Sequence, residues 1–174
     1  MRGPGAATSK MDTFEAIRKR ASVREYGIKP LPKETIEKIV DAGRLAPTAR
    51  GEEPWEFIVV IEPKTKDKIA QLATSGSFIK EAAACVAIFC KDTKYYLEDG
   101  CAATENMLIA ATALQVASCW VAGDKKPYCA EIAKILGVPE GYRLISIVAL
   151  GYPYGKVALH EKRPLDKIIH WDKF

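Results

Sequence analysis

The chain lacks any long run of apolar residues. Its longest such stretch, residues 82–90, is far shorter than the roughly 18 residues that a membrane-spanning helix requires. The first ten residues also lack the apolar core of a secretory signal. These absences argue against a membrane protein and a secreted protein, and they favour a cytoplasmic location.

Signatures of metal sites and disulfide frameworks are missing too. The chain has five cysteines, an odd number, and no Cys-x-x-Cys pair. Its two histidines, His160 and His170, have no cysteine or carboxylate neighbour at ligand spacing. We therefore expect reduced, mostly buried cysteines and no metal site.

Familiar catalytic motifs are absent or incomplete. No Gly-x-Gly-x-x-Gly loop is present, so a Rossmann dinucleotide domain is not predicted. Residues 77–80 have the Ser-x-x-Lys spacing of some acyl-transfer enzymes, but the companion motifs are missing. Without a Ser-His or Cys-His arrangement, the side chains offer little covalent or proton-transfer machinery. Any chemistry is therefore expected to belong to a cofactor, with no catalytic side chain.

The charge balance gives nucleic acid little to bind. The chain has 26 Lys and Arg against 22 Asp and Glu, a formal net charge of +4, and no basic run interleaved with aromatics. With 174 residues, 48% of them hydrophobic, it can bury one substantial core. Residues 1–10 contain no acidic residue, so we expect a disordered extension there and a single domain over residues 11–174.

The spacing of apolar residues predicts alternating helices and short strands. Asp12 and Glu15 have capping-box spacing and open a helix that ends near Arg20. Pro32, suited to a first helical turn, opens a second helix that must stop before Pro47. The other expected elements are strands at 55–61, 86–90, 117–121 and 144–150, and helices at 64–73, 99–116 and 127–136.

Two segments suggest a second subunit. The helix expected over residues 99–116, with Asp99 as candidate N-cap, is apolar on most sides and should be buried on most sides. The last segment, residues 152–174, has no clear period yet carries Trp171 and Phe174. Such a tail is more easily explained by wrapping a partner than by freedom in water.

Arg20, Ser22 and Arg24 form a candidate anion site where the first helix should end. Guanidinium groups hold phosphate by paired hydrogen bonds, and a serine hydroxyl can donate another. Taken alone, Arg-x-Ser-x-Arg is also typical of an ordinary solvated helix end. Three further segments add weight to it: Ala-Pro-Thr at 46–48 with Glu-Pro-Trp at 53–55, Ser-Cys-Trp-Val-Ala-Gly at 118–123, and Lys-Arg-Pro at 162–164.

In this order and at this spacing, the four segments resemble the nitroreductase family of flavin mononucleotide (FMN) enzymes, and the likeness runs from Phe14 to Asp172. The resemblance implies an α+β fold, a three-layer α/β/α sandwich with a mixed, mostly antiparallel sheet, in an intertwined homodimer. It also implies FMN as cofactor, in sites shared across the dimer interface, and NADH or NADPH as co-substrate.

The resemblance assigns a role to each residue of the anion site. It implies that Arg20 and Ser22 face the phosphate and the ribityl chain of FMN. Arg24 would reach the pyrimidine edge of the flavin, where reduction leaves negative charge that a cation stabilises.

Other implied contacts come from the three remaining segments. The loop of Pro47, Thr48 and Ala49 would lie against the flavin of the other subunit. The stretch of Trp120, Val121, Ala122 and Gly123 would supply backbone amides to flavin N5 and O4, from Ala122 and Gly123. Lys162 and Arg163 match a second phosphate clamp, in a register that the sequence does not fix.

The implied function is that of an FMN-dependent oxidoreductase. Hydride would pass from NADH or NADPH to flavin N5, and the reduced flavin would then reduce a small acceptor such as a nitro compound or a quinone, by a ping-pong mechanism. Two alternatives stay open. One is an FMN-binding carrier or sensor without catalysis, and the other is a specialised flavin enzyme such as a dehalogenase.

The chain departs from the family pattern at two positions. Gly51 and Glu53 stand where the family usually has Asn and Gln. These changes put the substrate preference in doubt rather than FMN binding. The chain also has little insertion between Cys90 and Asp99, so we expect a rather open flavin face.

Overall fold

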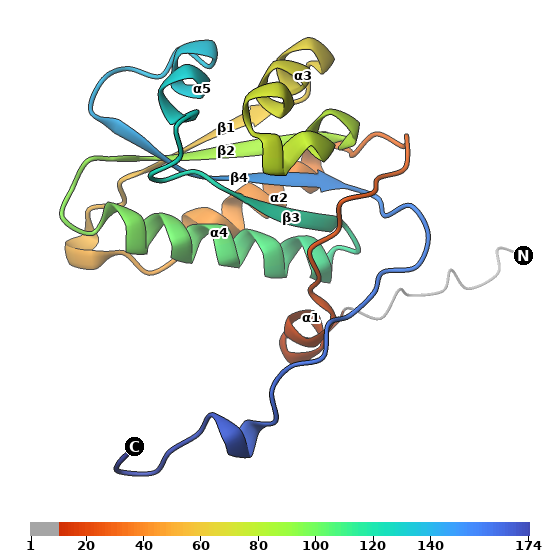
Figure 1. Ribbon diagram of the computed structural model, residues 1–174, viewed down its shortest axis with the longest axis vertical. Coiled ribbons are helices and arrows are strands. Elements are labelled where there is room, and N and C mark those ends of the chain that lie inside the picture. The colour runs from red at the N-terminus through yellow and green to blue at the C-terminus, as the bar shows by residue number, and fades with distance from the viewer. Residues whose placement is uncertain (1–10) are drawn as a thin grey trace, which may run out of the picture.

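A four-stranded antiparallel sheet lies at the centre of the protein (Figure 1). The structure is a computed structural model that describes residues 11–174, so the disorder expected for residues 1–10 lies outside the described residues. The strands lie in the order β1-β2-β4-β3, with antiparallel pairing throughout. Their bounds are Trp55–Val60 for β1, Ala84–Lys91 for β2, Ala117–Ala122 for β3 and Tyr142–Gly151 for β4.

Helices cover both faces of this sheet. Helices α2 (Lys33–Arg44) and α4 (Tyr96–Ala113) lie on one face, and α3 (Pro63–Leu72) and α5 (Cys129–Ile135) lie on the other (Figure 1). Helix α1 (Thr13–Lys19) packs against α4. The expected three-layer α+β sandwich with a mostly antiparallel sheet is therefore confirmed.

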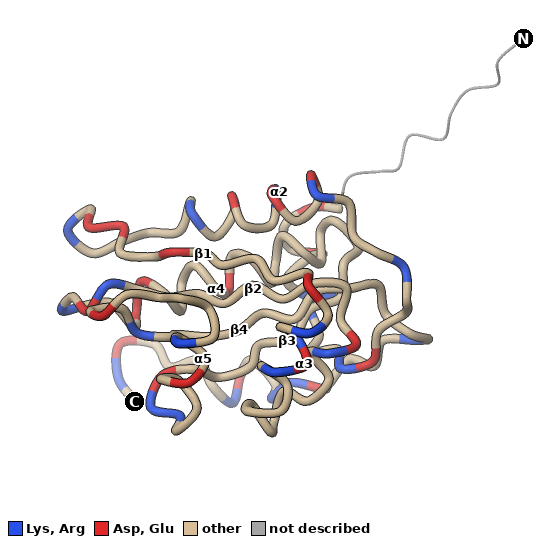
Figure 2. The backbone as a smooth tube through the Cα atoms, turned by 90° about the horizontal axis from the view of Figure 1, so that it is seen from above, with Lys and Arg blue, Asp and Glu red and all other residues tan. Residues whose placement is uncertain are grey.

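The core follows from the apolar character of the two central strands. Side chains of β2 and β4 are buried along nearly the whole of each strand, and they contribute to an apolar cluster on each face of the sheet. Figure 2 shows that Lys, Arg, Asp and Glu gather mainly on the surrounding helices and loops. Within residues 11–174, none of the helices combines the length and the apolarity needed to cross a bilayer.

Several expected boundaries were wrong by a few residues. Helix α4 begins at Tyr96, so Asp99 lies inside its first turns and is not its N-cap. Pro32 is the N-cap of α2 and not a residue of its first turn. Short 3₁₀ segments, which periodicity does not reveal, occur at Ala49–Gly51, Thr74–Glu81 and Leu165–Lys167. The Asp12 cap was correct, because its carboxylate accepts the Glu15 amide at 2.9 Å.

Candidate cofactor site

An extended segment after α1 runs along the free edge of β3. The Val23 amide donates to the Ser118 carbonyl at 2.9 Å, and Ser22 forms a parallel bridge with Ser118. Further on, the Gly27 amide donates to the Tyr152 carbonyl at 2.9 Å. Main-chain hydrogen bonds thus fix the segment between the edge strand and the chain that leaves β4.

Tyr26 anchors this segment to the core. Its side chain is buried, and its hydroxyl donates to the Val23 carbonyl at 2.7 Å. Burial, together with the nearby Cys119 thiol, raises the pKa of Tyr26 far above its usual value, so the phenol stays protonated and keeps its donor. Because side chains alternate along extended chain, Ser22 and Val23 then face opposite sides.

Basic residues from both ends of the chain line one pocket of about 480 Å³. No carboxylate belongs to the lining of this pocket. The absence of a carboxylate suits a phosphate dianion, because a second negative charge would repel it. The structure thus brings Arg20 and Ser22 together with Lys162, across more than a hundred residues of sequence. The full lining is Ile17, Arg18, Arg20, Ala21, Ser22, Leu159, His160 and Lys162.

The two arginines of the anion site are held differently. The Arg20 side chain is 24% exposed, and its Nε lies 3.8 Å from Oε1 of Glu105 on α4. Arg24 is exposed, and its guanidinium lies 5.9 Å from the centroid of the Phe78 ring. Arg24 lines an adjoining pocket of about 240 Å³, which shares Ser22 and His160 with the larger one.

The C-terminal basic pair is split by the fold. Lys162 lines the pocket, whereas Arg163 donates to the Lys167 carbonyl at 2.9 Å within its own tail. Two polar lining residues, Arg18 and His160, were not predicted from the sequence. His160 had a signal, because residues two apart in extended chain point to the same side, and His160 precedes Lys162 by two.

The stretch at the end of β3 is only partly accessible. Trp120 packs against the core cluster on the α4 side of the sheet, and Val121 is buried in the cluster on the other side. Ala122 is exposed. The Gly123 amide donates to the Ile145 carbonyl at 3.0 Å, so this amide already has a partner within the chain.

The peptide groups at Ala122 and Gly123 are held from three sides. A Cβ on Gly123 would lie 2.6 Å from the Ile145 carbonyl carbon, so only glycine fits here. The Tyr128 hydroxyl donates to the Ala122 carbonyl, and the Cys129 thiol donates to the Gly123 carbonyl at 2.9 Å. This turn is therefore rigid before any ligand arrives.

The loop of Pro47, Thr48 and Ala49 is not part of this pocket. None of the three lines either of the cavities that contain Ser22. The loop lies instead beside the first turns of α4, where Thr48 and Ala49 donate to the buried carboxylate of Asp99. Within one chain, the structure does not bring the predicted loop and the anion site together.

The two departures from the family pattern lie in a loop with unusual backbone geometry. Gly51 has a φ of 68° and Glu53 a φ of 43°, both in the left-handed region. Glycine is the residue that tolerates this region best, so Gly51 suits the backbone demand at its position. The Glu53 side chain is exposed, and the contact that this residue makes is through its amide, which donates to Thr48 Oγ1 at 3.0 Å.

No cysteine is activated as a nucleophile. Burial raises the pKa of both Cys85 and Cys90 to about 12. It also raises the pKa of Cys101, Cys119 and Cys129, although Arg24, Ser22 and Arg20 pull that of Cys119 downward. Among residues 11–174 there is no group of three or more His, Cys, Asp or Glu that could hold a metal ion.

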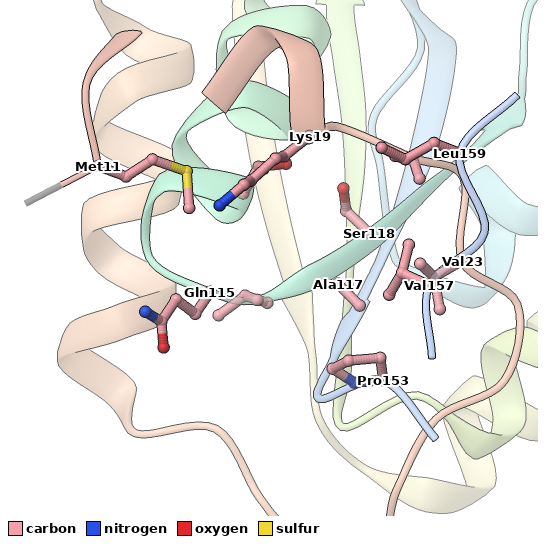
Figure 3. A pocket seen from close by; sticks show the side chains of 12 residues that line it. Met11, Lys19, Val23, Gln115, Ala117, Ser118, Pro153, Val157 and Leu159 are labelled. Atoms are coloured by element: carbon pink, nitrogen blue, oxygen red, sulfur yellow. The ribbon is translucent and has the colours of Figure 1, made fainter. Parts of the chain in front are cut away.

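A third cavity, of about 320 Å³, adjoins the basic pocket and is mostly apolar. Val23, Ala117, Val157 and Leu159 surround it (Figure 3). The hydroxyl of Ser118, which also lines it, is buried and has no hydrogen-bond partner among the described residues. Ala21 and Leu159 line both cavities, so they form the wall between them.

Comparison with known proteins agrees with this fold. The family model described as "Putative TM nitroreductase" matches residues 12–174. A "Putative NADH dehydrogenase/NAD(P)H nitroreductase" of Methanothermobacter thermautotrophicus is 34% identical over 95% of this chain and 90% of its own length.

Two solved structures are also similar. A "Putative NADH dehydrogenase/NAD(P)H nitroreductase" from Parabacteroides distasonis has a TM-score of 0.89 at 30% identity, over 93% of this chain and 98% of that one. A nitroreductase with bound FMN from Bacteroides fragilis has a TM-score of 0.79 at 26% identity, over 93% and 99%.

The three-layer α+β sandwich of this chain is shared with these nitroreductase structures. The chain belongs to the nitroreductase family, as the resemblance of its four segments had indicated.

The left-handed backbone at Gly51 gives a direct stability test. Gly51→Val should lower the free energy of unfolding by about 1–2 kcal/mol, because a branched residue at positive φ is strained, whereas Gly51→Asn should cost less. A Cβ at this position would meet nothing within 4 Å, so no steric clash interferes. Urea unfolding measures both values.

Gly137 provides a matched control for this test. It has a φ of 66°, an equally open Cβ position and no place in the candidate site. Gly137→Val should therefore cost about as much as Gly51→Val. Equal stabilities for Gly51→Val and Gly51→Asn would contradict our account of the loop.

Proposed function

We propose that this protein binds FMN and uses it to reduce a small acceptor with NADH or NADPH. The observation that carries this proposal is the pocket in which Arg18, Arg20 and Lys162 converge with Ser22 and without a carboxylate. The FMN bound in the related Bacteroides fragilis nitroreductase supports the same choice of cofactor.

The residues present fit the terminal phosphate of FMN. Arg20 can offer a bidentate contact, Lys162 a mobile point charge, and the Ser22 hydroxyl a neutral donor. Glu105 approaches Arg20 at Nε, which leaves the other guanidinium nitrogens for an anion. A single cluster of this kind suits one terminal phosphate rather than the pyrophosphate of a dinucleotide.

When bound, FMN would supply the two-electron chemistry, by hydride transfer from NADH or NADPH and then reduction of an acceptor such as a nitro compound or a quinone in a ping-pong cycle. The chain would contribute binding, orientation and charge. Arg24 provides a cation for the flavin's pyrimidine edge. No acid, base or thiol of the chain is needed as a catalytic group.

A homodimer completes the site in this proposal. The pocket of one chain lacks the Pro47 and Thr48 loop, which a twofold-related chain would supply, so that each chain gives its own loop to the site of the other. Exposed apolar residues provide the contact area. They are Phe14 and Ile17 on α1, and Leu159, Leu165, Ile168, Ile169, Trp171 and Phe174 in the tail that leaves the body beyond α1 (Figure 1).

Substitution of each basic residue by alanine should rank their contributions to FMN binding. Arg20→Ala should weaken FMN binding about ten- to a hundredfold, because a charge-assisted contact is worth roughly 1.5–3 kcal/mol. Lys162→Ala should have a smaller effect, because a mobile point charge is lost. Arg163→Ala, the matched control outside the pocket, should bind nearly as wild type. Quenching of flavin fluorescence on titration gives the three dissociation constants, and equal effects for all three would refute the pocket.

Reduction of the bound flavin distinguishes a reductase from a carrier or sensor. The FMN-loaded protein is mixed anaerobically with NADH or NADPH while the flavin absorbance near its visible maximum is followed. Rapid bleaching with at least one nicotinamide is expected, followed by recovery of the absorbance when a quinone or nitro compound is added. A spectrum that stays oxidised with both nicotinamides would favour the carrier or sensor instead.

A further inference from the structure

Asp99 is a buried carboxylate that the proposed chemistry does not use. Its side chain lies in the first turns of α4, and the residue is only 4% exposed. None of the ion pairs within residues 11–174 includes it. A buried carboxylate without a cation must be satisfied by hydrogen-bond donors, because its desolvation is otherwise costly.

Among the described residues, the hydrogen-bond donors to its carboxylate all come from the loop expected to reach the flavin. Thr48 Oγ1 donates to Asp99 Oδ2 at 2.7 Å. The Ala49 amide donates to Oδ1 at 3.1 Å and to Oδ2 at 3.3 Å. The carboxylate and the loop therefore satisfy each other, and none of these contacts involves a residue of the basic pocket.

Thr48 passes this restraint to the far end of the loop. While its hydroxyl donates to Asp99, its oxygen accepts the Glu53 amide at 3.0 Å. Between these two contacts, Arg50 and Gly51 both have left-handed backbone, and so does Glu53. Such a run is unfavourable on its own, so the Thr48 hydroxyl closes a loop that would otherwise open.

Helix α4 gives Asp99 a rigid base. The adjacent Gly100 fits so closely against the sheet that a Cβ there would lie 2.6 Å from a side-chain carbon of Ile145. Asp99 is thus fixed relative to the sheet, and through it the loop is fixed too.

We propose that Asp99 is a positioning residue that holds the 47–49 loop, through Thr48, in the shape that meets FMN. The inference rests on the proposed function, because it takes this loop to be the flavin contact supplied to the second subunit. Without the contacts between Asp99 and Thr48, the loop would populate other conformations. The apparent dissociation constant for FMN would then equal the intrinsic constant divided by the fraction of molecules whose loop has the FMN-binding conformation.

The test compares the same substitution, threonine to valine, at two positions: Thr48 in the loop and Thr104 on α4. Thr48→Val removes the hydroxyl of the loop with little change of shape. Thr104→Val removes another buried hydroxyl from α4, one that is bonded to Gly100 and Ser146 and not to the loop. Thr48→Ser restores the hydroxyl, and Asp99→Asn replaces one of the two accepting oxygens with an NH2 donor while keeping the side chain's shape.

Two quantities are measured for each full-length variant: the dissociation constant for FMN and the visible circular dichroism of the bound flavin. Thr48→Val and Asp99→Asn should weaken FMN binding about tenfold and alter the dichroism. Thr48→Ser should behave as wild type. Thr104→Val should unfold at lower urea yet keep the wild-type dissociation constant and spectrum.

Two results would overturn the inference, and they differ from each other. If wild type binds FMN and Thr48→Val matches it in affinity and spectrum, the positioning role is wrong while the proposed function stands. If wild type itself binds no FMN, the proposed function fails and the inference fails with it. Asp99→Asn need not fold for this decision, because Thr48 is only half-buried and its variant carries the test alone.

Discussion

The candidate site depends first on one main-chain contact, the hydrogen bond from the Val23 amide to the Ser118 carbonyl. It joins the segment after α1 to the edge of the sheet and so fixes the direction in which Arg20, Ser22 and Arg24 point. Val23 then faces the apolar cavity while Ser22 faces the basic pocket. Since the tail that follows β4 runs past the same segment, Lys162 and His160 reach the pocket from the other end of the chain.

Most of the fold could be predicted from the sequence, because strands such as 144–150 and the capped first helix carry strong local signals. The exceptions are positions where contacts between residues far apart in the sequence determine the structure. Asp is a residue type typical of an N-cap, but α4 begins before Asp99. Its carboxylate accepts a hydrogen bond from Thr48, in a loop about fifty residues away. Lys162 and Arg163 are neighbouring cations that the sequence cannot rank. Only the path of the tail places Lys162 in the pocket and Arg163 outside it. No local pattern contains that information.

The predicted site is in two parts in a single chain, and this division has a physical consequence. The cations that suit a phosphate converge near α1. The loop of Pro47 and Thr48 is instead held by Asp99, in the first turns of α4. Apolar side chains such as Trp171 and Phe174 are left exposed. A second copy of the chain accounts for both facts, because it would cover apolar surface and bring the missing loop. Gly51 and Glu53 fit this account, since the loop is shaped by backbone and by Thr48 rather than by side-chain amides.

The most direct measurement of this shared site uses a mixed dimer. One chain carries Arg20→Ala with Ser22→Ala, and the other carries Pro47→Gly with Thr48→Val, each pair of changes chosen to inactivate its homodimer. The two chains bear different tags so that the mixed dimer is purified away from both homodimers. If the sites are shared, one site has both lesions and the other has neither, so about half of the wild-type reductase activity returns. If each site lies within a single chain, both sites stay damaged, and a purified mixed dimer without activity would contradict the account.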